Sequence, residues 1–149
     1  MLKILNFCLI FIFLSNCGYT PIYSNSKNNK INIQIHKISG NKEINNLIVQ
    51  KLSTYDDDNS NKIYNIELKS DFQKLILTKD ATGNATNFRL NMNITFISTS
   101  GENTKEYLFF EKFDIKKGDT IFEEEKYENI IKNDMINLII QRFISQLLI

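Results

Sequence analysis

Strict alternation between Phe88 and Phe96 constrains the fold of this chain more than any other feature. Every second residue of this stretch is large and apolar, and the residues between them are arginine, asparagine and threonine. Successive side chains of a strand point to opposite faces, so a period of two predicts a strand with one buried and one wet face. The apolar residues are Phe88, Leu90, Met92, Ile94 and Phe96, and the polar ones are Arg89, Asn91, Asn93 and Thr95. A sheet covered on one side only satisfies this pattern.

Three other segments, 31–36, 62–77 and 107–115, have apolar residues at the spacing of a strand. In the second of them the apolar positions change parity after Phe72. That change predicts a bulge or twist near Gln73 and Lys74, since an extra residue moves the following side chains to the other face. Together with residues 88–96, these segments predict four strands.

Two segments have helical spacing instead. Apolar residues recur at intervals of three and four in residues 42–55 and again from Thr120 to Leu148. Thr120 and Glu123 form the pattern of a capping box, which predicts where the last helix begins. The apolar stripe of that helix is wider than an ordinary amphipathic face, which indicates either deep burial or a partner surface. The predicted order is β-α-β-β-β-α, an α+β two-layer sandwich in which two helices pack on one face of a four-stranded sheet.

The amino terminus has the three parts of a secretory signal. Lys3 precedes an apolar run from Ile4 to Leu14, and a polar break follows at residues 15–16. Eleven residues would extend about 16 Å as a helix, roughly half the hydrocarbon thickness of a bilayer, which excludes a transmembrane anchor. The competing interpretation is a buried N-terminal helix, but such a helix usually has a polar face. We therefore predict a signal peptide at residues 1–16.

Cys17 ends a Leu-Ser-Asn-Cys step that resembles a bacterial lipobox. The resemblance implies that Cys17 receives a diacylglyceryl thioether and becomes the first residue of the mature protein. Cleavage before Cys17 would also remove Cys8, leaving no disulfide in an oxidising periplasm. Gly18 follows the cysteine where an aspartate would indicate inner-membrane retention, so the expected location is the periplasmic side of the cell outer membrane. Residues 17–30 are predicted to be a lipidated tether, and residues 31–149 a single α+β domain.

The composition favours neither nucleic-acid binding nor catalysis. Eighteen basic and seventeen acidic residues leave a net charge of +1, which creates no strong field for nucleic acid. His36 is the only histidine, its neighbours are not metal ligands, and it is expected to face solvent. The acidic run 56–58 lacks the glycine and the spaced oxygen ligands of a calcium loop. We therefore expect no metal, no cofactor and no enzymatic activity.

Two sequence motifs resemble a known family. The stretch Cys17-Gly18-Tyr19 with Pro21-Ile22-Tyr23 is similar to the start of the LPS-assembly lipoprotein (LptE) family. The stretch from Thr82 to Leu90 is similar to that family's turn and third strand. The order of elements and the long last helix agree as well, and the resemblance covers residues 17–149.

The resemblance implies a plug inside the LptD outer-membrane β-barrel, which would help that barrel assemble and deliver lipopolysaccharide to the surface. It also implies that the turn at residues 78–87 lies close to lipopolysaccharide. The candidate contacts there are Lys79, Thr82, Gly83 and Arg89. No large apolar side chain holds this turn, so it is expected to be mobile unless a partner grips it.

Two other interpretations stay open. A periplasmic lipoprotein auxiliary to another lipid or solute transporter would share the signal but not the barrel partner. An exported enzyme would need a reactive constellation, and the sequence contains none.

Overall fold

The computed structural model describes residues 31–148 of the chain. The elements are β1 (Asn32–Gly40), α2 (Lys42–Leu52), β2 (Ile63–Lys79), β3 (Ala85–Ser100), β4 (Asn103–Lys116) and α3 (Ile121–Leu147). Their order confirms the predicted β-α-β-β-β-α arrangement and the α+β class. The predicted signal peptide, the lipidation site Cys17 and the tether lie outside the described residues and stay predictions.

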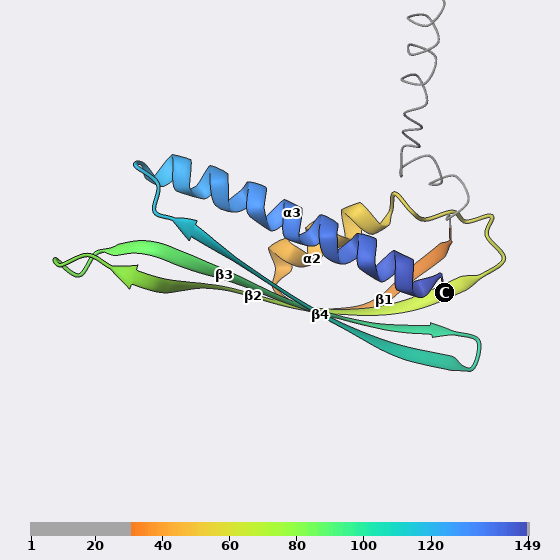
Figure 1. The fold of residues 1–149 in the computed structure, drawn as a ribbon. Helices are drawn as coiled ribbons and strands as arrows, with labels where there is room; N and C mark the ends of the chain where they lie inside the picture. The colour runs from red at the N-terminus through yellow and green to blue at the C-terminus, as the bar shows by residue number, and fades with distance from the viewer. Residues whose placement is uncertain (1–30, 149) are drawn as a thin grey trace, which may run out of the picture.

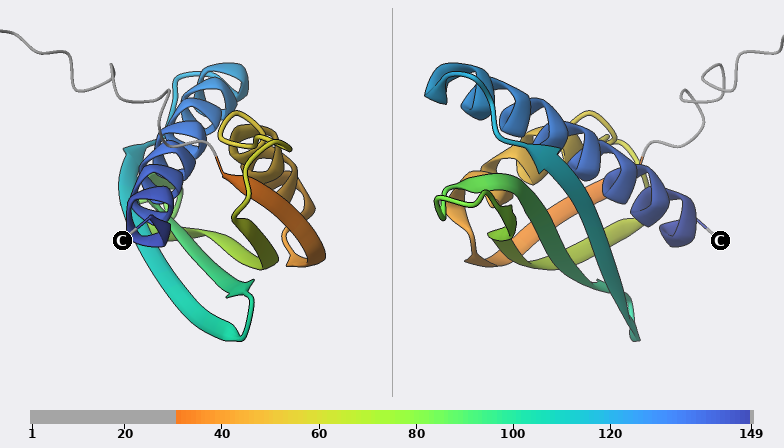
Figure 2. Two further views of the ribbon diagram at one scale, coloured as in Figure 1. Left: turned by 90° about the vertical axis from the view of Figure 1, so that its right-hand side faces the viewer. Right: turned by 60° about the vertical axis from the view of Figure 1, so that its left-hand side comes forward.

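The four strands form one sheet in the order β1-β2-β3-β4. β1 pairs with β2 in parallel, joined by the crossover through α2, whereas β2, β3 and β4 pair antiparallel. Both helices lie on the same side of this sheet, and α3 runs across it from the end with the β2–β3 turn toward the other (Figure 1, Figure 2). The core lies between the helices and the sheet, and the other face of the sheet is open.

The alternation of β3 has the predicted consequence. Leu90, Met92, Ile94 and Phe96 are fully buried beneath the helices, and their polar neighbours lie on the open face. Phe96 stacks on Phe143 of α3 with ring centroids 4.0 Å apart. Burying such side chains is the main favourable contribution to folding. The period-two pattern therefore identified both the strand and its buried face.

The capping box at the start of α3 is present as predicted. The Glu123 N–H donates to the Thr120 hydroxyl over 3.2 Å, and the Glu123 carboxylate accepts from the Thr120 N–H over 3.2 Å. The wide apolar stripe is explained by burial in the C-terminal part of the helix, where the apolar side chains across the width of the stripe are packed in the core. The buried residues are Ile131, Met135, Ile136, Ile139, Ile140, Phe143, Ile144 and Leu147.

The first helix is shorter than predicted. Asn41 caps it by accepting a hydrogen bond from the Ile44 N–H over 3.1 Å, but the helix ends at Leu52 rather than at residue 55. The hydroxyls of Ser53 and Thr54 donate to the carbonyls of the preceding turn over 2.8 and 2.7 Å. Such side-chain bonds compete with continued helix, which accounts for the earlier end.

The predicted bulge in β2 is in the wrong place. Pairing with β3 is regular through Gln73 and Lys74, and the register shifts only between Ile76 and Lys79, next to the turn. The strand therefore continues without a change of face, and Leu75 lies on the open side, 45% exposed. The prediction failed because it assumed that every large apolar residue of β2 faces the core.

A chain of ion pairs ties the helices to β2 where the apolar core thins toward the start of α3. Lys74 of β2 contacts Glu124 and Glu128 of α3, at 2.6 and 2.9 Å. Glu128 also contacts Lys132 at 3.0 Å, and Lys132 reaches Glu43 of α2 at 3.2 Å. The Lys132 side chain is only 9% exposed, so its charge depends on these partners.

This cluster predicts that the domain loses stability in acid. Burial is the largest influence on Glu128 and would raise its pKa, but hydrogen bonds and charge from Lys74 and Lys132 together lower it. A glutamate whose pKa is lowered by folding stabilises the folded state fully at pH values above its ordinary pKa of about 4.3. That stabilisation is lost as the pH falls through the lowered pKa. Glu128→Gln should lower the free energy of unfolding at pH 7 by about 1–3 kcal/mol and by less near pH 3. Denaturant titrations at both pH values measure this.

The matched control is Glu125→Gln on the exposed side of the same helix turn. It should change stability little at either pH. Equal effects of the two substitutions at pH 7 would contradict a structural role for the cluster.

Candidate functional site

The β2–β3 turn is organised by one carboxylate. Asp80 Oδ1 accepts hydrogen bonds from the Thr82 N–H and the Asn84 N–H, both over 2.9 Å, and from the Thr82 hydroxyl over 2.7 Å. The hydroxyl bond, followed by the Asn84 N–H bond, lowers the pKa of Asp80. Aspartate commonly organises turns in this way by bonding to backbone two residues ahead. Hydrogen bonds to the Asp80 carboxylate therefore hold the turn. The expectation of a mobile turn was based only on its lack of large apolar side chains.

Gly83 lies at the tip of this turn with a φ of +87°, a backbone conformation that favours glycine. A Cβ atom added there would meet no atom within 4 Å. Substitution at this position would therefore strain the backbone without displacing any neighbour. Thr82 lies in the same turn, and Lys79 is the last residue of β2 before it. The contact of these residues with lipopolysaccharide stays a prediction.

Arg89 does not join that group. It lies on the open face of β3, opposite Leu75, farther along the strand from the turn. Its guanidinium forms a two-point ion pair with Asp114 of β4, at 2.7 and 2.8 Å. The pair raises the pKa of Arg89 and lowers that of Asp114. Lys79, by contrast, is exposed and takes part in none of the ion pairs within residues 31–148. Lys79 is thus the cation available to a ligand at the tip.

The open face of the sheet is polar with an apolar strip at one side. Asn91, Asn93 and Thr95 occupy its centre, and the Oδ1 atom of Asn91 is buried there without a hydrogen-bond partner within the described part of the chain. Leu108 and Phe110 of β4 project beside them, 73% and 56% exposed. A surface of this kind offers many hydrogen-bonding groups and a small apolar contact.

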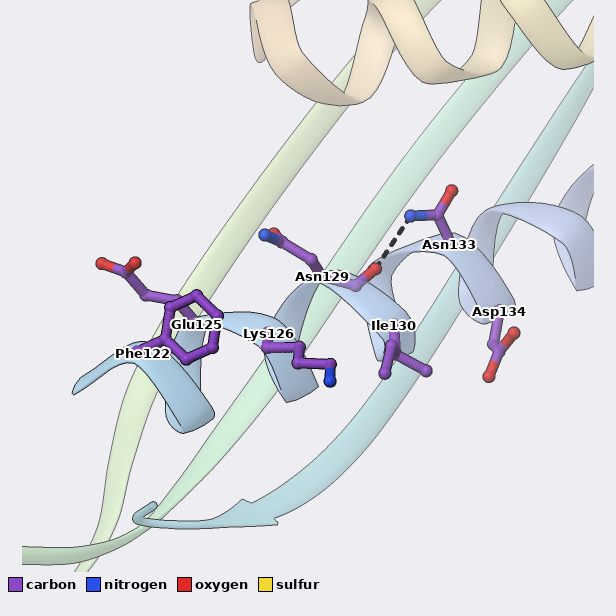
Figure 3. Close-up of a pocket in the computed structure, with 7 residues that line it drawn as sticks. All are labelled: Phe122, Glu125, Lys126, Asn129, Ile130, Asn133 and Asp134. Atoms are coloured by element: carbon purple, nitrogen blue, oxygen red, sulfur yellow. Dashed lines mark hydrogen bonds between the residues drawn. The ribbon is translucent and has the colours of Figure 1, made fainter. Parts of the chain in front are cut away.

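A second exposed apolar area lies on the first half of α3 (Figure 3). Phe122 and Ile130 border a shallow groove of about 530 Å³ on that helix. They are 72% and 48% exposed. Polar side chains complete the lining, and Asn133 donates to the Asn129 carbonyl over 2.9 Å beside them. The wide apolar stripe of α3 was expected from the sequence, but this exposed area was not. Its signal was the pair of apolar residues, Ile121 and Phe122, directly after the cap Thr120.

His36 is exposed, as predicted, and its Nε2 atom lies 2.6 Å from the Asn65 side-chain oxygen. Within residues 31–148, no group of three or more histidine, cysteine, aspartate or glutamate side chains is arranged to hold a metal ion. None of the described helices is long and apolar enough to span a membrane.

Solved structures of bacterial lipoproteins share this fold. Rare lipoprotein B from Shewanella oneidensis superimposes with a TM-score of 0.54 at 18% identity, over 77% of this chain and 96% of that one. The uncharacterized lipoprotein B from Nitrosomonas europaea gives 0.50 at 15% identity, over 80% and 84% of the two chains. The minor lipoprotein from Acinetobacter baumannii gives 0.50 at 13%, over 76% and 94%.

Neither the family models nor the curated proteins gave a match to the sequence. The predicted resemblance to the LptE family is confirmed at the level of the fold, because the chain superimposes on rare lipoprotein B, whose fold is LptE-like. This chain has the fold of rare lipoprotein B.

Proposed function

We propose that this chain is an outer-membrane lipoprotein that plugs a large β-barrel of the LptD type, helps it assemble and assists lipopolysaccharide transport to the cell surface. The observation that carries the proposal is the fold, which matches rare lipoprotein B over 96% of that protein's chain. The lipobox-like step before Cys17 supports a lipid anchor on the periplasmic side of the outer membrane.

The polar open face of the sheet supports the proposal that the chain lies inside a water-filled barrel. The lumen of an outer-membrane barrel is lined by polar side chains and water. Asn93, Thr95 and the Arg89–Asp114 pair present hydrogen-bonding groups over a regular sheet that can match such a lining. An apolar face would instead leave the polar groups of the lumen without partners.

The β2–β3 turn supports a contact with lipopolysaccharide. The tip projects beyond the helices at one end of the sheet (Figure 1). Lys79 supplies a cation there that forms no ion pair with the described residues, and Thr82 and Gly83 form the surface beside it. Phosphate groups pair strongly with such cations. Arg89 is a secondary candidate because Asp114 already neutralises it.

Gly83→Val tests the role of the turn. The substitution should cost about 1–2 kcal/mol of stability through backbone strain, since a Cβ atom there meets open space. It should nevertheless weaken the outer-membrane barrier strongly, because the altered tip would no longer fit its partner. Thermal unfolding of the purified protein and entry of a large antibiotic into cells measure the two effects.

Gly101→Val is the matched control. Gly101 also has a positive φ, +60°, and open space around its Cβ position, but it lies in the β3–β4 turn at the opposite end of the sheet (Figure 1). It should lose similar stability and leave the barrier intact. The role of the Gly83 turn is refuted if the barrier suffers equally in both variants or in neither.

Cys17→Ala tests the anchor. The variant should take up no palmitate analogue, and it should persist as a precursor or leave the membrane fraction. The reason is that the protein without its acyl chains has no stable lipid anchor. Metabolic labelling and membrane fractionation measure this, with Cys8→Ala as the control that should be labelled normally. Labelling of the Cys17→Ala protein would disprove lipidation at this residue.

A further inference from the structure

The shape of the β2–β3 turn is not fixed by apolar packing. All residues from Asp80 to Asn84 are exposed, and the one apolar side chain among them is that of Ala81. The backbone closes the turn with two hydrogen bonds. The Asp80 N–H donates to the Asn84 carbonyl over 2.9 Å, and the Gly83 N–H donates to the Asp80 carbonyl over 3.0 Å. Such bonds contribute little net stability in water, so the shape of the turn also depends on its polar side chains.

The Asp80 carboxylate supplies this further constraint. Its Oδ1 atom accepts from two N–H groups and from the Thr82 hydroxyl, and its Oδ2 atom accepts from the Asn84 side-chain amide over 3.4 Å. The same amide donates to the Thr82 hydroxyl over 2.8 Å. Hydrogen bonds to a charged acceptor are roughly twice as strong as those between neutral groups. None of the ion pairs within residues 31–148 involves Asp80, so its carboxylate serves the turn itself.

These hydrogen bonds also determine what the turn offers to a partner. The N–H groups of Thr82, Gly83 and Asn84 are all bonded inside the turn. Anions bind to turns through successive N–H groups that point outward, and these three are not free to do so. Recognition of an anionic group is therefore left to the ammonium group of Lys79, at the base of the turn. The rest of the turn can be recognised by its shape.

We propose that Asp80 is a positioning residue, whose carboxylate holds the β2–β3 turn in the shape that the β-barrel partner binds. The inference rests on the proposed function, because the barrel is the partner in both. A turn that is already ordered loses less conformational freedom when it binds, which favours the complex. Removal of the carboxylate should weaken binding to the barrel about tenfold, which corresponds to the cost of ordering the backbone of one residue.

Two substitutions of Asp80 separate shape from charge. Asparagine keeps a side-chain oxygen that can accept from the Thr82 and Asn84 N–H groups, whereas alanine has no such oxygen. In Asp80→Ala these two N–H groups should exchange faster with solvent, as measured by NMR of the full chain in detergent. Asp80→Asn should retain most of their protection. Both variants should unfold at nearly the temperature of the unaltered chain, because the side chain is exposed.

Binding to the barrel is measured by competition in the cells that make it. A variant and the unaltered chain are expressed together with different tags, and the amount of each that co-purifies with the barrel is compared. Asp80→Ala should be recovered about tenfold less than the unaltered chain, and Asp80→Asn should be recovered nearly as well. Glu102→Ala is the matched control, because Glu102 is an exposed acidic residue beside the positive-φ glycine of the opposite turn. It should compete as well as the unaltered chain.

Equal recovery of Asp80→Ala and the unaltered chain, or unchanged exchange of the two N–H groups, would overturn the positioning role and leave the barrel proposal intact. The role would also be overturned if Asp80→Asn kept the two N–H groups protected but competed as poorly as Asp80→Ala, since charge rather than shape would then be recognised. An unaltered chain that recovers no β-barrel protein would contradict the proposed function, and the positioning role would fail with it.

Discussion

Phe143→Ala is expected to lower the free energy of unfolding by about 3–5 kcal/mol. Phe143 is completely buried, stacks on Phe96 and meets Tyr107 and Phe109 edge to face, with centroids 5.3 and 6.4 Å away. Truncation would leave a cavity where α3 crosses β3 and β4. Because a domain of this size is stable by only about 5–15 kcal/mol, the loss would be a large share of the total. Denaturant unfolding measures it.

Phe122→Ala is the control on the same helix. Its ring is 72% exposed beside the α3 groove, so its removal should change stability by less than about 0.5 kcal/mol. Similar losses in the two variants would mean that α3 does not pack on the sheet as described.

Gly40→Ala should be as damaging as the loss of Phe143. Gly40 ends β1 with a φ of +95°, and a Cβ atom there would lie 1.8 Å from the Ser70 carbonyl oxygen of β2. That oxygen accepts from the Asn41 N–H over 3.1 Å, so it cannot move without breaking the start of α2. Backbone strain and the forced displacement together should cost about 3–5 kcal/mol. Thermal and denaturant unfolding measure the loss.

Gly101→Ala separates the two causes. It introduces the same kind of backbone strain in open space, so it should cost only about 1–2 kcal/mol. The difference between the two variants is the effect of the contact with Ser70. If both cost the same, the close approach of β1 to β2 at Gly40 would be disproved.

Local patterns predicted most of the fold. The alternation of β3 and the capping box at Thr120 each depend on residues within one element, and both are present. The predictions failed where residues distant in the sequence determine which face of the sheet a side chain occupies. Leu75 lies on the open face because pairing with β3 keeps β2 regular, and no pattern within β2 contains that information.

The candidate site was predicted in part for the same reason. A glycine at a turn tip is typical of a residue with positive φ, and Gly83 has a φ of +87°. The ion pair of Arg89 with Asp114 joins residues far apart in the sequence, so the sequence could not separate Arg89 from Lys79. The hydrogen bonds that Asp80 accepts in the turn could have been predicted from the sequence, since an aspartate two residues before Thr82 is a turn signal.

The barrel partnership is tested most directly by affinity purification of the tagged full chain from the outer membranes of its own cells. We expect one very large β-barrel protein to co-purify in about equal amount under mild detergent, and Gly83→Val to reduce its recovery while Gly101→Val does not. Recovery of the lipidated chain without any β-barrel protein, or with subunits of another transporter instead, would contradict the proposed function.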